Sequence, residues 1–261
     1  MKTKVLQKMF RILECVVTHS PKPVLLPELV SVSGLNKQTC ARLIADLVEL
    51  GYLEHAGARK GFRAGIRAFA LGKQTRYEPD LRQIAAPYVK EAAERLETFV
   101  TFSQMYNGQR YNLLEYNGSP SLSIDLRPLG NNDLAFTASG HVFLACMTPA
   151  EREKLFLHHP EILTVTSFMH RVFGDAESRN RYFNEVRKDG YVSLITELWG
   201  ITAVPIFLDG VCIAAFASAR PIDLVTREKQ HFDVEFLTTS GREISRKYAL
   251  KHIKEPLSIV F

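Results

Sequence analysis

A short polar segment carries side chains of the types that recognise nucleic acid. Asn36 is a favourable N-cap, so Lys37, Gln38 and Thr39 would form the exposed first turn of a helix, with Arg42 one turn further on. Amide and hydroxyl groups can read base edges in the DNA major groove, whereas cationic groups bind phosphates. We expect Gln38 and Thr39 to read bases. Arg42 either grips the groove or serves the helix itself, and Asn36 caps the helix and can touch a phosphate.

Two short helices must position this segment. Pro27 suits a first helical turn and Gly34 suits the left-handed conformation that ends a helix, so one helix is expected between them. A second helix follows Asn36 and ends near Gly51; its apolar residues recur at helical spacing, namely Leu43, Ile44, Leu47, Val48 and Leu50. This pattern is typical of a helix-turn-helix. An ordinary helical hairpin has the same pattern, so both interpretations remain open at this point.

The distribution of charge favours the helix-turn-helix. Residues 1–76 contain 13 Lys and Arg against 5 Asp and Glu, whereas residues 77–261 contain 20 against 23. The formal net charge of +5 therefore conceals a basic N-terminal part and a mildly acidic remainder. A basic surface on the segment that holds the two helices is the electrostatic feature expected of a phosphate-binding domain.

A predicted β-hairpin follows the second helix. Tyr52–His55 and Phe62–Ala64 are expected to pair across a glycine-bounded turn, as in the wing beside a recognition helix. Its three cations, Arg59, Lys60 and Arg63, are expected to contact phosphates or the minor groove. A merely solvated turn would not require one sign of charge, and no acidic residue occurs between Ala56 and Arg63.

Two segments in the second half could form a small-molecule site. Thr137, Ala138, Ser139 and Gly140 begin a predicted helix, whose free N–H groups could bind a carboxylate or phosphate. The alternative is an ordinary N-cap with a glycine for close packing. Further on, Glu197 and Trp199, with Ser193 upstream, could supply an aromatic wall and polar groups. The alternative there is that Trp199 anchors the core and Glu197 is a solvated acid.

The sequence contains no recognisable catalytic or metal-binding arrangement. There is no phosphate-cradling glycine loop, no nucleophile elbow and no HExxH, and the four cysteines lie far apart. We therefore expect neither an enzyme nor a cofactor or bound metal. The basic, apolar start fits an amphipathic helix better than a signal peptide, and no apolar run is long enough to span a membrane. We expect a cytoplasmic protein without membrane contact.

The chain is long enough for two domains, 1–76 and 77–261. In the second, β-rich runs separated by Asn-Gly and Asp-Gly turns alternate with helices, and 122–126 is a further predicted strand. Mostly antiparallel strands flanked by helices define an α+β fold.

Five motifs, in this order, resemble the IclR-type bacterial transcription regulators. They are GLNKQTCARLI (34–44) with the later Leu47 and Gly51-Tyr52, FRAGIR (62–67), TASGHVFLA (137–145), RKDGY (187–191) and ITAVPI (201–206). The resemblance covers nearly the whole chain. It implies a winged helix-turn-helix followed by a GAF-like effector-binding and oligomerisation domain, without catalysis. It also implies a homodimer or homotetramer on double-stranded promoter DNA that senses a small organic acid, aromatic or central-metabolic.

The resemblance places effector contacts on several segments of the second domain. They fall on the helix start at Ala138, Ser139 and Gly140, and on apolar positions Leu122, Ile124, Leu134, Ile201 and Ala217. The sequence departs from the family pattern in two places: the acid-rich loop is shortened to Ser193–Glu197, and His141 replaces a basic residue. The expected function is a DNA-binding regulator controlled by a small carboxylate. The alternative is a ligand-binding protein or enzyme that retains the helix-turn-helix only for oligomerisation.

Overall fold

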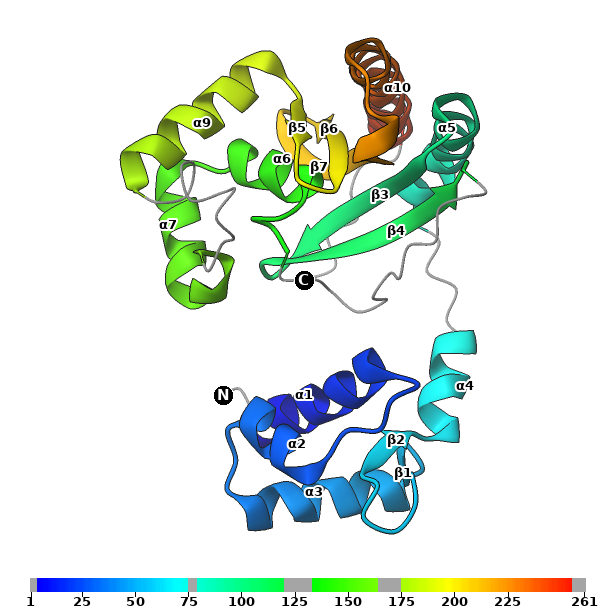
Figure 1. Cartoon of the computed structure of the whole chain (residues 1–261), viewed down its shortest axis with the longest axis vertical. Helices are drawn as coiled ribbons and strands as arrows, with labels where there is room; N and C mark the ends of the chain where they lie inside the picture. The colour runs from blue at the N-terminus through cyan, green and yellow to red at the C-terminus, as the bar shows by residue number, and fades with distance from the viewer. Residues whose placement is uncertain (1–3, 75–78, 120–132, 164–174, 255–261) are drawn as a thin grey trace. The chain divides into compact units, whose positions relative to one another are not determined.

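The computed structural model describes residues 4–74, 79–119, 133–163 and 175–254. The chain divides into two compact units, Met1–Tyr77 and Glu78–Phe261 (Figure 1). The N-terminal unit has one hydrophobic core, and the C-terminal unit has two, one on each face of its sheet.

The N-terminal unit is a three-helix core with a small hairpin. Its elements are α1 (Lys4–His19), α2 (Leu26–Ser33), α3 (Lys37–Glu49), β1 (Leu53–His55), β2 (Phe62–Ala64) and α4 (Ile66–Gln74). The apolar stripes of α1, α2 and α3 meet in one cluster that includes Ile12, Leu29, Leu43 and Leu47, each at most 5% exposed. The helical spacing of these residues thus produces the core directly.

The ends of α2 and α3 are fixed by local chemistry. Gly34 ends α2 at a φ of 61°, a conformation that costs a glycine little. Asn36 caps α3, because its side-chain oxygen accepts a hydrogen bond from the Thr39 backbone N–H at 2.8 Å. From the sequence, Gly72 is expected to begin a connector, but this is wrong in part because α4 continues through Gly72 to Gln74. A single exposed glycine costs a helix only about 1 kcal/mol, so it does not end the helix by itself.

The C-terminal unit is built on a five-stranded antiparallel sheet with strand order β4-β3-β7-β6-β5. The strands are β3 (Phe99–Tyr106), β4 (Gln109–Asn117), β5 (Val192–Ile195), β6 (Trp199–Leu208) and β7 (Val211–Pro221). Asn107-Gly108 forms the tight turn between β3 and β4, and Asp209-Gly210 forms the tight turn between β6 and β7. All four of these residues have positive φ. This backbone conformation is the reason for the Asn-Gly and Asp-Gly pairs.

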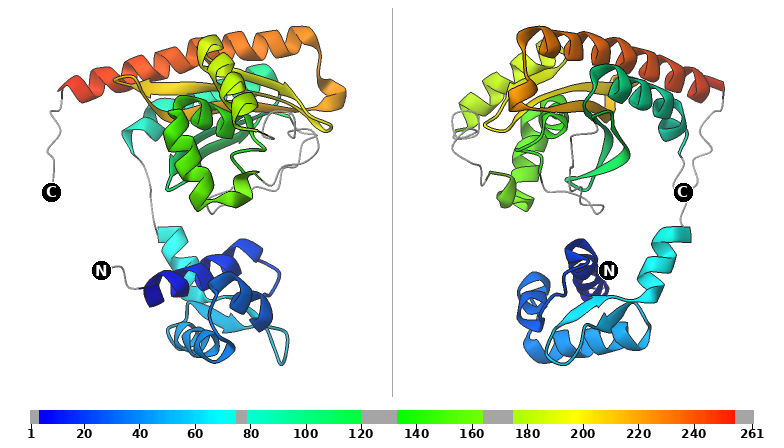
Figure 2. Two further views of the ribbon diagram at one scale, coloured as in Figure 1. Left: turned by 90° about the vertical axis from the view of Figure 1, so that its left-hand side faces the viewer. Right: turned by 45° about the vertical axis from the view of Figure 1, so that its right-hand side comes forward.

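Helices cover both faces of the sheet. On one face lie α5 (Asp80–Leu96) and the long α10 (Arg227–Lys254), packed on residues such as Phe102, Val204 and Phe216 (Figure 2). On the other lies α6 (Ala138–Cys146), which contacts α9 (Ala176–Asp189) and packs over Ala203, Ala215 and Ala217. The strands alternate between the two cores residue by residue, as the pleat requires. The helix α7 (Pro149–His158) and a 3₁₀ turn (Pro160–Leu163) lie beside α6 and complete the second core.

Candidate functional site

The first turn of α3 presents a polar surface on the N-terminal unit. Lys37, Gln38 and Arg42 are exposed, while the neighbouring Cys40 is fully buried. Gln38 and Arg42 are four residues apart and therefore share one face of the helix. Alanines at 41 and 45 are also exposed, so this side of α3 carries little bulk. A narrow helix with polar groups near its start has the shape that enters a major groove.

The hairpin presents further cations. Arg59 and Lys60 are exposed in the turn between β1 and β2, and Arg59 itself has a φ of 60°. The turn packs closely against the backbone at Val24. A Cβ on Gly61 would lie only 2.4 Å from the Val24 carbonyl oxygen, so this position has no room for a side chain. Arg63 is exposed but not free, since its Nε donates to Glu54 Oε1 at 2.5 Å. The sequence reasoning overlooked this partner, which lies directly opposite Arg63 in the hairpin.

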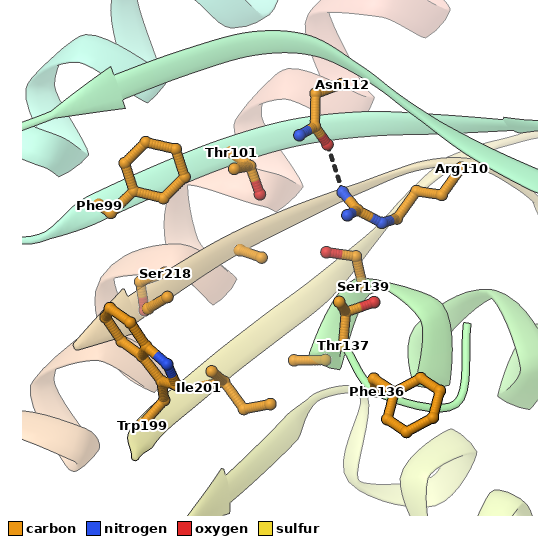
Figure 3. A pocket seen from close by; sticks show the side chains of 13 residues that line it. Phe99, Thr101, Arg110, Asn112, Phe136, Thr137, Ser139, Trp199, Ile201 and Ser218 are labelled. Carbon is orange, nitrogen blue, oxygen red and sulfur yellow. Dashed lines mark hydrogen bonds between the residues drawn. The ribbon is translucent and has the colours of Figure 1, made fainter. Parts of the chain in front are cut away.

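A cavity of about 260 Å³ lies in the C-terminal unit between the start of α6 and the sheet (Figure 3). Four strands, β3, β4, β6 and β7, and the residues that lead into α6 contribute to its wall. The described lining residues are Phe99, Thr101, Arg110, Asn112, Phe136, Thr137, Ala138, Ser139, Trp199, Ile201, Ala217, Ser218 and Ala219. Its volume is near the lower end of the range for small-molecule pockets.

One end of this cavity is polar. Arg110, on β4, has a side chain only 7% exposed, and the carboxylate of Asp133 accepts hydrogen bonds from its Nε (3.0 Å) and Nη2 (2.6 Å). Its Nη1 donates to the side-chain oxygen of Asn112. The Thr137 hydroxyl donates to the Asp133 carbonyl and accepts from the Gly140 N–H, which fixes the start of α6. Figure 3 shows Arg110 close to Ser139 and Thr137 at this end.

The other end of the cavity is apolar. Phe99, which is 7% exposed, and Trp199 both lie there, with Ile201 beside the tryptophan (Figure 3). The cavity therefore has a polar end and an aromatic end, an arrangement suited to an amphiphilic small molecule.

The sequence-predicted effector residues fall into four groups. The cavity is lined by Ala138, Ser139, Trp199, Ile201 and Ala217. Leu134 and Gly140 do not line the cavity and pack against each other behind it. Their contact is so close that a Cβ on Gly140 would lie 2.3 Å from the Leu134 carbonyl oxygen. Ser193 lies on β5 and Glu197 is exposed in the turn before β6, and neither lines the cavity. Leu122, Ile124 and the strand predicted around them lie outside the described residues.

Sequence reasoning missed seven residues that line the cavity: Phe99, Thr101, Arg110, Asn112, Phe136, Ser218 and Ala219. A partial signal existed for two of them. The sequence predicts a strand from Tyr111 to Tyr116, which contains Asn112 and begins next to Arg110; on the observed β4 the two residues are two apart and share one face of the sheet. Nothing in the sequence indicated that the start of a helix from a distant segment would cover that face.

His141 is a core residue. Its Nε2 donates to the Ala135 carbonyl at 2.9 Å, and in the neutral ring its Nδ1 accepts from the Tyr182 hydroxyl at 2.8 Å. Burial lowers the pKa of His141 to about 4, and burial likewise raises the pKa of Tyr182. At neutral pH this position thus supplies no positive charge to the cavity.

Several known proteins are similar to this chain. Residues 5–57 match the family model described as the IclR helix-turn-helix domain. The transcriptional regulator KipR of Bacillus subtilis (strain 168) is 22% identical over 238 residues, which span 88% of this chain and 91% of KipR. The N-terminal unit therefore carries a helix-turn-helix domain of the IclR type. The regulator TtgV of Pseudomonas putida is 25% identical over 74% of the chain and 68% of its own length.

Solved structures of IclR-type regulators share the fold of this chain. An IclR family regulator from Brucella abortus superposes with a TM-score of 0.77 at 21% identity, covering 95% of this chain and 93% of that one. An IclR homologue from Microbacterium hydrocarbonoxydans, complexed with 4-hydroxybenzoate, superposes with a TM-score of 0.66 at 22% identity; the shares covered are 93% and 98%. No helix within the described residues is long and apolar enough to cross a membrane. Over the same ranges, no three His, Cys, Asp or Glu side chains gather as a metal site would require.

Proposed function

We propose that this IclR-type regulator binds specific promoter DNA through α3 and the hairpin, and that a small carboxylate in the C-terminal cavity controls this binding. The observation that carries the DNA-binding role is the exposed polar start of α3 on a helix-turn-helix. Gln38 and Thr39 read base edges, Lys37 and Arg42 grip the groove, and Asn36 holds the helix start in place. Arg59 and Lys60 bind phosphates, while Arg63 exchanges Glu54 for a phosphate.

The start of α6 provides the seat for the carboxylate. The backbone N–H groups of Ala138 and Ser139 are in the first turn of α6, and neither has a hydrogen-bond partner within the part of the chain that the structure describes. The N-terminus of a helix favours an anion through these N–H groups and through its dipole. The Ser139 side chain adds a hydroxyl that is buried and lines the cavity. The homologue complexed with 4-hydroxybenzoate supports a small carboxylate as the ligand.

The ligand controls DNA binding by shifting the population between two arrangements of a homodimer or homotetramer. A helix-turn-helix dimer binds two half-sites, so a change in their spacing changes affinity. Self-association has support in α1, where Val5, Leu6 and Phe10 are each about half exposed (51%, 50% and 49%). Exposed apolar side chains grouped on one helix are typical of an interaction surface.

A gel mobility-shift assay tests the DNA-binding role. The full chain should shift DNA from upstream of its own gene, and Gln38→Ala should weaken binding to this DNA more than to an unrelated duplex. Lys188→Ala, which removes an exposed cation from α9 in the C-terminal unit, is the matched control and should change neither. Absence of any sequence-dependent shift at low salt would instead favour the alternative in which the helix-turn-helix serves only oligomerisation.

A thermal-shift experiment tests the effector site. We expect 4-hydroxybenzoate to raise the unfolding temperature of the full chain, because a ligand that binds only the folded state stabilises it. Ser139→Trp should abolish this stabilisation by filling the cavity. Circular dichroism would verify that this variant is folded. Stabilisation that survives in the folded variant would place the ligand site elsewhere.

A further inference from the structure

The single cation among the described lining residues of the cavity is Arg110. We propose that Arg110 selects a carboxylate and that the ligand is an amphiphilic monocarboxylate. Its carboxylate lies between Arg110 and Ser139, and its apolar body lies between Phe99 and Trp199. This inference rests on the proposed function and adds to it the residue that recognises the anion and the class of acid that fits.

The Arg110 side chain is held so that part of its guanidinium remains available. Asp133 and Asn112 accept from three of its five N–H groups, and the other two have no partner within the described ranges. The guanidinium is planar and the bidentate contact with Asp133 fixes one edge, so the directions of the remaining N–H groups are fixed too. Figure 3 shows the guanidinium between Asn112 on one side and Ser139 on the other, at the polar end of the cavity.

The charge of Asp133 sets how selective this end of the cavity is. Asp133 neutralises Arg110, and its side chain is 28% exposed whereas that of Arg110 is 7% exposed. An incoming carboxylate therefore meets a neutral pair and the positive end of α6, whose hydrogen bonds offset its desolvation but leave little affinity beyond that. A second source of affinity is required, which the aromatic end supplies by burying an apolar body.

The size and shape of the cavity limit the apolar body. A volume of about 260 Å³ holds roughly one ring with a substituent, given that drug-sized ligands occupy larger pockets. The aromatic end contains Phe99, Trp199 and Ile201 and has no charged side chain among its described residues. A second carboxylate there would remain without a cation. We therefore expect acids with one carboxylate and one apolar end, and we exclude dicarboxylates.

Isothermal titration calorimetry of the full chain with benzoate, benzamide and acetate tests the proposal. Benzoate should bind at least about tenfold more tightly than benzamide, since hydrogen bonds to charged groups are worth that much. It should also bind more tightly than acetate, which lacks the apolar body.

Arg110→Gln should remove the preference for benzoate and leave benzamide binding unchanged. Asp133→Asn should tighten benzoate binding several-fold by removing a repelling charge. Arg187→Gln is the matched control, because its guanidinium binds the Ala145 and Met147 carbonyls outside the cavity.

The outcomes separate this inference from the proposed function. If Arg110→Gln keeps the preference for benzoate while Ser139→Trp loses binding, the cavity is the effector site but Arg110 does not select the anion. Equal affinity for acetate and benzoate would overturn the amphiphilic class. If Arg110→Gln does not fold, Asp133→Asn decides alone, and an unchanged benzoate affinity refutes the inference. Failure of the unmodified chain to bind any of the three would overturn this inference and the proposed carboxylate effector, whereas the DNA-binding role is decided by the mobility-shift assay.

Discussion

The salt dependence of DNA binding should separate the hairpin cations by their partners. Lys60 is exposed and has no ion-pair partner within the described residues, whereas Arg63 is paired with Glu54. The two side chains of that pair are 57% and 46% exposed. An ion pair this exposed is worth at most about 1 kcal/mol, so a phosphate can compete with Glu54 for Arg63. We therefore expect substitutions at Lys60, Arg63 and Glu54 to have three different effects.

The magnitudes follow from counterion release. Each phosphate contact contributes about 0.9 to the slope of log affinity against log salt. Lys60→Ala should flatten the slope by about that amount, so affinity would fall about 3.5-fold less between 50 and 200 mM salt. Arg63→Ala should flatten the slope by less, because Arg63 is only partly committed to the phosphate. Glu54→Gln should steepen it, because it frees Arg63 from its internal partner.

Fluorescence anisotropy with a labelled duplex, titrated at several potassium chloride concentrations, measures these slopes. Lys188→Ala on α9 is the control and should leave the slope unchanged, because this exposed lysine lies in the other unit. A Lys60→Ala slope equal to that of the unmodified chain would show that the hairpin does not contact phosphate. A flatter slope for Glu54→Gln would contradict the competition between Glu54 and DNA.

Three further substitutions test the local arguments. Asn36→Ala should cost about 1 kcal/mol by removing the cap on the Thr39 N–H, and hydrogen exchange of peptides from α3 in the full chain should report it. His141 is held neutral with a pKa of about 4 against an ordinary 6.5, so its contribution to stability is present above pH 6.5 and is lost as pH falls through 4. That contribution is at most about 3 kcal/mol, and denaturant unfolding should show a flatter acid dependence in His141→Gln. Gly140→Ala would force a Cβ to within 2.3 Å of the Leu134 carbonyl oxygen. We therefore expect about 1–3 kcal/mol of destabilisation in denaturant melts, together with weaker ligand binding. A Gly140→Ala variant as stable as the unmodified chain would refute the close packing of α6.

The N-terminal unit could be predicted from the sequence because its determinants are local. The Gly34 turn, the Asn36 cap and the apolar stripe of α3 act within a few residues, and each has the predicted geometry. What the sequence did not reveal was the pairing of Arg63 with Glu54. These residues are nine apart, and only the register of the hairpin brings them opposite one another.

The cavity could be predicted only in part because it is assembled from distant segments. The start of α6 and the strand from Trp199 were identified by their own small and aromatic residues, and both line the cavity. Arg110 and Asn112 were missed because β4 lies on the cavity only through the order β4-β3-β7-β6 of the sheet. Asp133 is 23 residues from Arg110, and sequence spacing gives no reason to pair them.

A buried ion pair behind the cavity should tolerate removal of both partners better than removal of one. Arg220 and Asp233 are 5% and 4% exposed, and Asp233 also accepts from the Ser218 hydroxyl at 3.2 Å. Burial nevertheless raises the pKa of Asp233 despite the nearby Arg220, and the Arg220 Nε has no partner in the described part of the chain. The loss of hydration thus outweighs the attraction between the two charges.

Arg220→Met alone should therefore cost about 3–5 kcal/mol, because it leaves the Asp233 carboxylate buried without a cation. Adding Asp233→Leu should recover most of that loss, since an apolar pair of similar size needs no hydration. The raised pKa also fixes the pH dependence: the contribution of Asp233 to stability is present below its ordinary range and is lost as pH rises through its folded value. Denaturant unfolding of both variants across pH measures these effects. A double variant no more stable than Arg220→Met would show instead that the pair stabilises the unit, through the bond from Arg220 to the Leu96 carbonyl at the end of α5.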